Sequence, residues 1–290
     1  MNFKQIAIIG VGLLGGSFAL AMRKQNTVEK IIGVSRRLSS AENALALGVI
    51  DEATDDIKKA VKGADLVLIA TPMLSMQTVL QQVAEVVHAD CLITDVGSVK
   101  SALVDMMQSY FPQLLPQFVF AHPIAGSERS GVTAARVDLF ANKHLILAET
   151  HLAKPKFVTM NREIWRSLGA NVVEMPAKQH DAVFAYTSHL PHVVAYALVN
   201  NLHQQENNQQ LFEFASAGFY DFTRIASSDP VMWRDICLSN KQEVLNSVRQ
   251  FSAQLSRLEQ AIEQSDADAL KEMFHDAKQA RDEGLIKKQH

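Results

Sequence analysis

The sequence has little cysteine, little net charge and an uncharged, glycine-containing stretch near its start. Of its 290 residues two are cysteines, Cys91 and Cys237, and the formal net charge is −3. Two cysteines in apolar surroundings form neither a disulfide framework nor a metal-binding pattern, so we expect a reducing, cytoplasmic location. The small charge and the lack of any block of like charges argue against a nucleic-acid partner. A small molecule is therefore the expected partner.

The uncharged stretch, IAIIGVGLLGGSFALAM, covers residues 6–22. A membrane-spanning helix needs about 20 apolar residues, and glycines interrupt this stretch. A signal peptide or a membrane anchor is the alternative, but the order of strand, glycine turn and helix favours a dinucleotide site without a membrane partner. Gly10, Gly12 and Gly15 form the pattern G-x-G-x-x-G at that turn. The residues expected to contact the cofactor there are Gly10, Gly12, Leu13, Leu14 and Gly15.

The first 176 residues alternate short apolar runs with amphipathic stretches. The runs are continuous, as in parallel strands that are covered on both faces. Strands are expected within 4–10, 30–35, 64–72, 91–98, 118–124 and 143–149, helices within 39–48 and 73–87, and one more helix and strand within 161–176. Strands that alternate with helices predict an α/β Rossmann-type fold with a doubly wound parallel sheet over residues 1–176.

After Pro176 the strand signal disappears, so residues 177–290 are predicted to form an all-α domain. Apolar residues recur there at three- and four-residue steps on one face of a long helix. They are Leu245, Val248, Phe251, Leu255, Leu258 and Ile262. This face packs either in the core of the domain or against a second subunit. Ser265 and Asp268 resemble a capping box that opens the last helix, and Gly284 is expected to end it.

The residues after the second expected strand bear on the choice of cofactor. About 20 positions after the glycines, an acidic residue normally accepts a hydrogen bond from the ribose 2′-hydroxyl of NAD. That place holds Ser35, Arg36 and Arg37 instead. Forked, permanently charged donors suit the 2′-phosphate of NADP, so NADP is favoured over NAD. The alternative is that both arginines belong to a solvated loop.

Polar groups stand at the expected carboxyl ends of three strands, where ligands bind in open sheets. Thr71 and Pro72 end one strand and are expected to line the cofactor site. Ser98 follows a second strand, and His122 comes directly after the run FVFA. An imidazole titrates near neutrality and suits acid–base chemistry. The alternatives are that Ser98 caps a helix and that His122 only fills a strand end.

Five separated motifs, in this order along the chain, resemble those of the prephenate/arogenate dehydrogenase family of tyrosine biosynthesis. They are GVGLLGGS, DVGSVK, HPIAGSERSG, TSHLPHVVAYAL and GFYDFTRIASSDPVMWRDI. The resemblance implies NAD(P)-dependent oxidation of a cyclohexadienol with loss of carbon dioxide, and prephenate is favoured over arogenate as the substrate. It also implies a helical domain of the 6-phosphogluconate-dehydrogenase-like type, through which two subunits form a homodimer.

The resemblance assigns roles to residues as well. His122 accepts the proton of the ring hydroxyl while hydride leaves the same carbon, and Ser98 orients that histidine and contacts the hydroxyl. Arg224 pairs with a substrate carboxylate, and His189 and Ser127 lie near the substrate.

A metal site is not expected. His189 and His192 are three residues apart, which suits a metal on a helix, but Pro191 lies between them and no third ligand is apparent. Trp233 is expected to pack close to the pocket.

Two other functions stay open. β-Hydroxyacid dehydrogenases and imine reductases share a nucleotide domain followed by a helical domain, and the former use a lysine on a helix, for which Lys178 is the nearby candidate. A regulator that binds NADP without catalysis is the second alternative. An acid near the substrate side chain would favour arogenate over prephenate, and Asp221 and Glu128 are the candidates.

Overall fold

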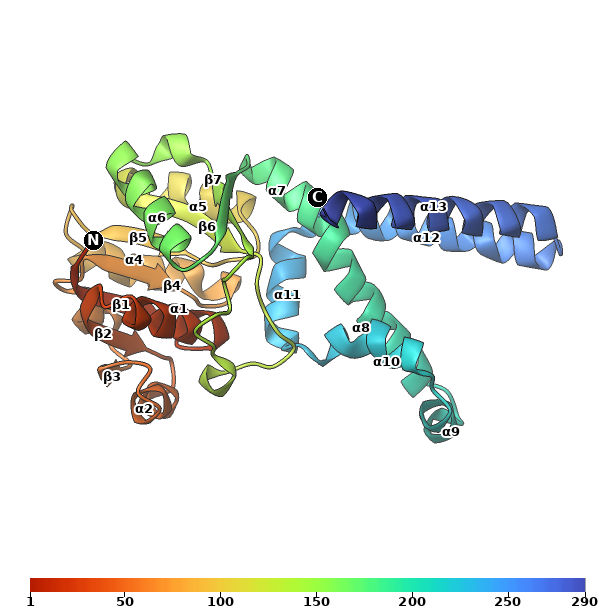
Figure 1. Ribbon diagram of the computed structural model, residues 1–290, viewed down its shortest axis with the longest axis horizontal. Helices are drawn as coiled ribbons and strands as arrows, with labels where there is room; N and C mark the ends of the chain where they lie inside the picture. Colours follow the sequence, from red (N-terminus) through yellow and green to blue (C-terminus); the bar gives the residue numbers. More distant parts are fainter. Residues whose placement is uncertain (290) are drawn as a thin grey trace. The chain divides into compact units, whose positions relative to one another are not determined.

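The computed structural model describes residues 1–289 and divides into two compact units, Met1–Lys241 and Gln242–His290. His290 lies outside the described residues. The first unit contains a sheet with helices on it and further helices after it, and the second contains long helices only (Figure 1).

An eight-stranded sheet of order β3-β2-β1-β4-β5-β6-β7-β8 forms the centre of the first unit. Neighbouring strands are parallel except for β6 and β7, which are antiparallel. The order reverses between β1 and β4, and doubly wound sheets bind ligands at such a reversal. The strands are β1 (Phe3–Ile9), β2 (Val28–Val34), β3 (Glu52–Thr54), β4 (Leu66–Ile69), β5 (Leu92–Asp95), β6 (Phe118–Pro123), β7 (His144–Ala148) and β8 (Asn171–Glu174).

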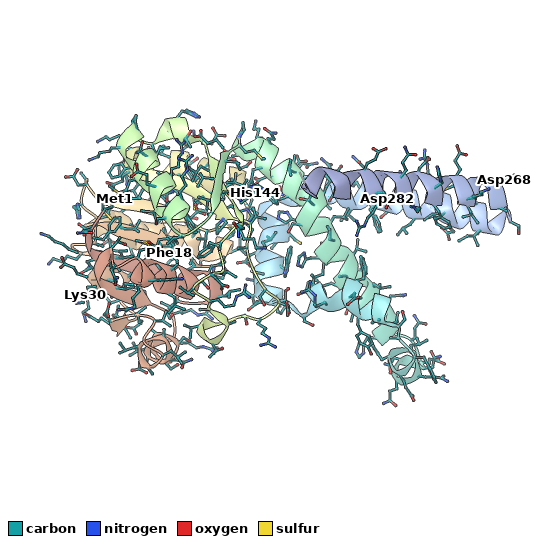
Figure 2. All side chains as sticks on the ribbon, in the orientation of Figure 1. Met1, Phe18, Lys30, His144, Asp268 and Asp282 are labelled. Carbon is teal, nitrogen blue, oxygen red and sulfur yellow. The ribbon has the colours of Figure 1, made fainter. Side chains whose placement is uncertain are left out.

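Helices cover both faces of this sheet (Figure 1). Side chains along a strand point alternately to two apolar clusters, so Ile6 and Ile8 belong to one cluster and Ala7 and Ile9 to the other. In the first cluster Phe18, labelled on α1 in Figure 2, packs 5.3 Å from the ring of Trp165. The helices here are α1 (Leu13–Lys24), α2 (Leu38–Ala46), α3 (Ile57–Val61), α4 (Met76–Val86), α5 (Ser101–Tyr110) and α6 (Pro155–Ser167), with the 3-10 turns η1 (Met73–Ser75), η2 (Pro112–Gln117), η3 (Val132–Ala134) and η4 (Thr150–Leu152).

The predicted α/β fold class is confirmed, with two differences in the strands. The short strand β3 was not among the predicted strands, because three residues are too few to show a periodic pattern. The expectation of a wholly parallel sheet is wrong at β7. The connection from β6 to β7 contains the turn η3 and no crossover helix, so the chain returns antiparallel.

The glycine-rich turn joins β1 to α1. Gly10 has a φ of 101°, and a Cβ there would lie 2.4 Å from the carbonyl oxygen of Ala70, at the end of β4. A Cβ on Gly15 would lie 2.2 Å from the carbonyl oxygen of Gly10. No heavy atom lies within 4 Å of the place where a Cβ on Gly12 would stand. Gly10 and Gly15 are therefore required by the fold itself, whereas Gly12 leaves open space beside the helix end.

The rest of the first unit is helical. Ala177 and Trp233, from two of its helices, join the second apolar cluster of the sheet. The amide of Leu74 also donates a hydrogen bond of 3.2 Å to Asp235, so these helices pack directly on the α/β part. The elements are α7 (Ala177–Phe184), the π-helical turn η5 (Ala185–His189), α8 (Leu190–His203), α9 (Asn208–Glu213), α10 (Ala217–Thr223), the 3-10 turn η6 (Arg224–Ser227) and α11 (Pro230–Ser239).

The continuous helical stretch Ala177–His203 is apolar on an unusually large part of its surface. By length and composition alone its 27 residues suffice to cross a membrane, and 17% of the most apolar window is buried within the chain. Its first part, α7, nevertheless carries the buried polar residues His180 and Asp181. The uncovered apolar surface of this stretch therefore lies mainly on α8.

The second unit consists of α12 (Lys241–Glu263) and α13 (Ala267–Gln289), joined by a short turn. Half of the apolar stripe predicted on α12 is exposed: Leu245, Leu255 and Ile262 are 37%, 50% and 64% exposed, whereas the other three residues are half-buried. Both interpretations of the stripe, core packing and a seam between subunits, stay predictions.

The predicted ends of the last helix are wrong. Asp266, not Ser265, caps α13, because its Oδ1 accepts a hydrogen bond of 2.9 Å from the amide of Ala269. Ser265 instead adopts a φ of 52° in the turn between the two helices. Gly284 does not end α13, which continues to Gln289, since an exposed glycine inside a helix costs only about 1 kcal/mol.

We expect Gly15→Ala to lower the free energy of unfolding by about 1–3 kcal/mol, because the new Cβ meets backbone atoms that cannot move aside. Gly12→Ala is the matched control, since its Cβ has open space. Urea unfolding followed by circular dichroism measures both variants. Equal midpoints for the two would contradict this account of the turn.

Candidate active site

The residues predicted to hold a dinucleotide lie together where the strand order reverses. Gly12 is the N-cap residue of α1 and its amide end carries no side-chain cap, while Leu13 and Leu14 begin the helix. The unpaired amides and the positive dipole end of a helix bind phosphate groups. Thr71, at the end of β4 beside Gly10, has a buried hydroxyl with no hydrogen-bond partner. A bare helix end and an orphan hydroxyl fit a bound dinucleotide.

Ser35, Arg36 and Arg37 follow β2, which neighbours β1 at the same edge of the sheet. The amide of Ser35 donates to the carbonyl oxygen of Thr54, which fixes the start of this segment. Arg36 and Arg37 are exposed. Among residues 1–289 no ion pair engages either guanidinium. Both are free to meet a phosphate at the ribose end of a dinucleotide, and Pro72 is exposed at the neighbouring strand end.

His122 lies at the end of β6 as the first member of a buried hydrogen-bonded chain. Its Nδ1 lies 2.8 Å from Nε2 of His180, whose Nδ1 lies 2.8 Å from Oδ1 of Asp181. Phe184 packs edge-on against the ring of His122, with the ring centroids 5.2 Å apart. His122 is 9% exposed. This row of hydrogen bonds engages Nδ1 of His122, and Nε2 of the same ring takes no part in it.

The electrostatics of this chain keep His122 neutral. Burial lowers the pKa of His122 well below 6.5, and the charges of His180, Lys100 and His189 lower it further. Burial also lowers the pKa of His180, although its hydrogen bond to Asp181 opposes the effect. Burial would raise the pKa of Asp181, but hydrogen bonds from His180 and from the first turn of α5 bring it below the ordinary value. At neutral pH Asp181 is therefore a carboxylate, and the imidazoles of His180 and His122 are both uncharged.

A buried ion pair fixes the backbone next to His122. Lys100 Nζ lies 2.5 Å from Asp95 Oδ2, and both side chains are fully buried. The same Nζ donates to the carbonyl oxygen of Ala121 at 2.7 Å, and the amide of Ala121 donates to Asp95 Oδ1 at 3.0 Å. The ion pair thus binds both the amide and the carbonyl group of Ala121, and it fixes the backbone from which the His122 side chain extends.

The structure does not place Ser98 as the sequence suggested. The expected hydrogen bond from Ser98 to His122 is not formed, because His180 occupies Nδ1 of that ring. The alternative that Ser98 caps a helix is also wrong, since α5 has Lys100 at its N-cap. The carboxylate of Asp181 accepts from the amides of Lys100 and Ser101, at 2.9 and 2.8 Å, and so caps α5 from α7. A contact between Ser98 and the substrate stays a prediction.

His189 and His192 have different environments. His189 is buried, Asn240 Nδ2 lies 3.2 Å from its Nδ1, and its Nε2 has no partner among the described side chains. Burial lowers the pKa of His189 to about 4. His192 stacks on Trp233 with ring centroids 3.6 Å apart, so Trp233 packs as expected. Within residues 1–289 no group of three or more potential metal ligands comes together.

Arg224 borders a hollow in the first unit. The hollow has a volume of about 490 Å³ and is lined by residues 126–129, 133–136 and Arg224. Arg224 forms an ion pair of 2.9 Å with Glu128, and its side chain is 59% exposed. Ser127 belongs to the same lining, and its hydroxyl accepts a hydrogen bond from the amide of Arg129. The structure therefore brings together two of the predicted substrate residues, Arg224 and Ser127.

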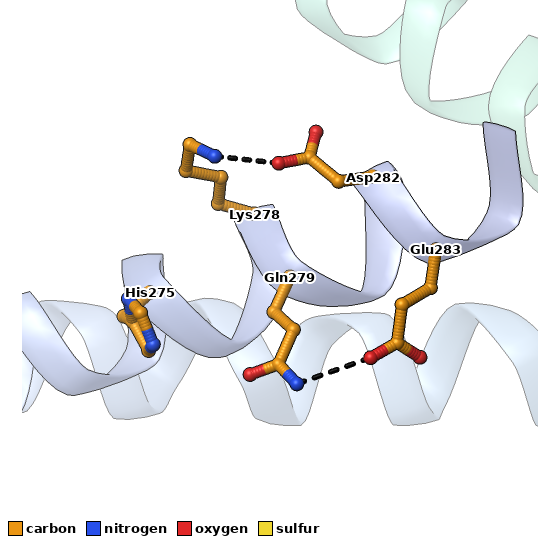
Figure 3. Close-up of a pocket in the computed structure, with 5 residues that line it drawn as sticks. All are labelled: His275, Lys278, Gln279, Asp282 and Glu283. Carbon is orange, nitrogen blue, oxygen red and sulfur yellow. Dashed lines mark hydrogen bonds and ion pairs between the residues drawn. The ribbon is translucent and has the colours of Figure 1, made fainter. Parts of the chain in front are cut away.

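A second hollow, of about 250 Å³, lies on α13 (Figure 3). Its polar groups are already paired along the helix: Lys278 with Asp282 at 2.5 Å, and Gln279 with Glu283 at 3.0 Å. Groups that satisfy one another on an exposed helix do not converge on a ligand. This hollow is not a candidate site.

Sequence reasoning missed the partners that hold His122. His180 and Asp181 lie 58 residues or more beyond it in the chain, on a helix whose start was noted only for Lys178. Lys100, inside the motif DVGSVK, is of a residue type that usually lies on the surface, but its side chain is fully buried. The pair HD at the start of an apolar helix was the available signal, because adjacent polar residues there need partners when the helix is buried.

The glycine turn at the switch point and the buried imidazole at the end of β6, on the same edge of the sheet, indicate a dinucleotide-dependent oxidoreductase. Two family models match the chain: "Prephenate dehydrogenase, nucleotide-binding domain" over residues 18–174 and "Prephenate dehydrogenase, dimerization domain" over residues 176–276. The chain belongs to the prephenate dehydrogenase family, and NAD(P) is its class of cofactor.

Relatives and solved structures agree with this assignment. Prephenate dehydrogenase of Bacillus subtilis is 41% identical over 96% of this chain and 75% of its own length. Cyclohexadienyl dehydrogenase of Zymomonas mobilis is 34% identical over 96% of this chain and 95% of its own length. The crystal structure of prephenate dehydrogenase from A. aeolicus in complex with hydroxyphenyl propionate and NAD+ matches with a TM-score of 0.88 at 35% identity, over 98% of this chain and 99% of that one.

We expect Lys100→Met to lower the free energy of unfolding by about 3–5 kcal/mol, because it leaves the carboxylate of Asp95 buried without its counter-ion, with only backbone amides as donors. The double variant Asp95→Asn/Lys100→Met should recover part of that loss, since no buried charge remains. Urea titrations of the wild type, both single variants and the double variant give the coupling. Additive effects would show that the ion pair is not what fixes Ala121.

Proposed function

We propose that this chain is a prephenate dehydrogenase, which oxidises prephenate with NAD(P)+ and releases carbon dioxide and 4-hydroxyphenylpyruvate. The observation that carries the proposal is the neutral, buried imidazole of His122 at the end of β6, on the same edge of the sheet as the nucleotide-binding turn. Its free Nε2 is suited to take a proton from the ring hydroxyl, and membership of the family supplies the substrate.

The chemistry places a clear demand on His122. Hydride leaves a carbinol carbon more easily as the oxygen gains negative character, so a base at that oxygen lowers the barrier. The bound nicotinamide supplies the hydride acceptor. The ketone that forms loses its ring carboxylate as carbon dioxide, and the electrons of that bond make the ring aromatic. A base that is neutral at working pH is the form required, and burial of His122 provides it.

Arg224, Ser127, His189 and Ser98 are the residues we propose for substrate binding. Arg224 is paired with Glu128 in an exposed ion pair, which solvent screens strongly. A substrate carboxylate can therefore compete for the guanidinium at little cost, and a forked contact would orient it. His189 offers its unpaired Nε2, which carries the proton because Nδ1 accepts from Asn240.

Prephenate is our choice over arogenate, with acceptance of both as the alternative. Asp221 is exposed and does not line the hollow at Arg224. Glu128 does line it, and Arg224 holds it until a substrate carboxylate takes its place. Similar proteins carry both kinds of name, among them the arogenate dehydrogenase of Synechocystis, at 26% identity and a TM-score of 0.76. Lys178, which a β-hydroxyacid dehydrogenase would need in its site, is exposed on α7, and the intact chain at His122 argues against a non-catalytic regulator.

NADP is the cofactor we propose, with NAD as the alternative. Ser35, Arg36 and Arg37 stand at the end of β2 without an acidic residue among them, and both guanidinium groups are exposed. The similar A. aeolicus protein was crystallised with NAD+, which supports the alternative.

A homodimer through the helical domain, in the cytoplasm, completes the proposal. The surface of α8 and half of the stripe on α12 are apolar and uncovered in one chain, which is how a subunit interface looks in the separated subunit. The family model over residues 176–276 is described as a dimerization domain. The free cysteines, Cys91 and Cys237, suit a reducing compartment.

We expect His122→Asn to lower kcat with prephenate by at least a few hundredfold, because the proton acceptor is lost. The Kd for the dinucleotide should stay nearly unchanged. Formation of reduced cofactor is followed with prephenate, arogenate and 3-hydroxyisobutyrate. Turnover of only the last substrate by the wild type, or full activity of the variant, would contradict the proposed function.

We expect Arg36→Ala to raise KM for NADP about tenfold or more and to leave KM for NAD within about twofold, since a bidentate contact to the 2′-phosphate is lost. Arg23→Ala is the control, because that arginine pairs with Asp51 outside the cofactor segment. A parallel change for both cofactors would mean that Arg36 does not read the 2′-phosphate.

A further inference from the structure

The hydrogen bonds around Asp181 determine which nitrogens of the buried chain carry protons. Oδ1 accepts from the amide of Lys100 and Oδ2 from the amide of Ser101, so both oxygens are used as acceptors. The carboxylate is ionised and has no proton to donate. Nδ1 of His180, at 2.8 Å, must therefore carry the hydrogen and donate it to Asp181.

The same argument passes along the chain to His122. A neutral His180 with its proton on Nδ1 presents a lone pair at Nε2. The Nδ1 of His122, 2.8 Å away, must then donate to that lone pair. The lone pair of His122 is left on Nε2, the nitrogen outside the chain.

We propose that His180, held by Asp181, is a positioning residue that fixes the tautomer of His122 and receives its Nδ1 proton during turnover. This inference rests on the proposed function. When Nε2 of His122 takes the proton of the substrate hydroxyl, Nδ1 passes its proton to Nε2 of His180. The chain then carries one positive charge next to the carboxylate of Asp181, and the reverse shift restores it when the proton leaves for water.

The surroundings explain why one imidazole is not enough. Lys100 faces His122 from the start of α5 and disfavours a positive charge on that ring, and the neighbouring His180 and His189 bring no negative charge to offset it. Lys100 faces His180 as well, but the hydrogen bond to Asp181 and the charges of Asp181 and Asp95 favour a positive charge there, so the charge is more stable on His180. Moving the charge by one ring keeps His122 basic without leaving a cation unpaired in the interior.

His180→Gln tests this arrangement. Glutamine accepts the hydrogen bond from Nδ1–H of His122 but cannot take the proton, so the proton affinity of the chain falls. We expect kcat to fall about 10- to 100-fold and the acid limb of the kcat–pH profile to move to lower pH by about one unit, with KM and dinucleotide Kd unchanged. His203→Gln, at the exposed end of α8, is the control and should change neither. A slower enzyme with the limb unmoved would reduce His180 to a structural role and overturn the proposal.

A second measurement does not depend on turnover. Nitrogen-15 spectra of the histidine-labelled wild type, with the His122 signals assigned by their loss in His122→Asn, should show a neutral ring protonated at Nδ1. Protonation at Nε2 in the wild type would overturn the proposal. Full activity of His122→Asn together with the expected spectra would instead contradict only the proposed function.

Discussion

The carboxylate of Asp181 is the group on which the arrangement of this site depends. It caps α5 through two backbone amides and holds His180 on its own helix, which in turn contacts His122 at the end of β6. Three elements that are distant in sequence are thus fixed by one buried charge. Such a charge is tolerated in an apolar interior because every acceptor position is matched by a donor. Without the carboxylate, neither the helix end nor the imidazole would have a defined partner.

The nucleotide-binding turn and the imidazole are supported by different physical means. Gly10 and Gly15 are fixed by steric exclusion, since a Cβ at either would run into backbone. His122 is fixed by electrostatics, through the Lys100–Asp95 pair below it and the hydrogen-bonded chain beside it. The first kind of support holds β1 against α1 and β4, and the second holds β6 against α5 and α7. Together they set the ends of three strands at one edge of the sheet.

The features that could be predicted from the sequence are those whose signals span only a few neighbouring residues. The strands, the glycine turn and the place of His122 rest on periodicity and spacing within a few residues, and these were confirmed. The antiparallel β7 depends on the path of a long connection, and the cap at Asp266 on one backbone conformation, so both were missed. Lys100, His180 and Asp181 were missed because their burial is decided by contacts with segments that lie 21 to 81 residues away. Their residue types alone suggest surface positions.

The buried chain also bears on how a dehydrogenase can use a base that burial makes weak. Burial keeps His122 neutral, which supplies the lone pair, but the same burial disfavours the charged form that proton transfer creates. A base with a very low proton affinity would be present yet ineffective. A second imidazole next to a carboxylate resolves this conflict, because the charge can be held where its partner already lies. The position of His180 between His122 and Asp181 thus lets one site be both dry and basic.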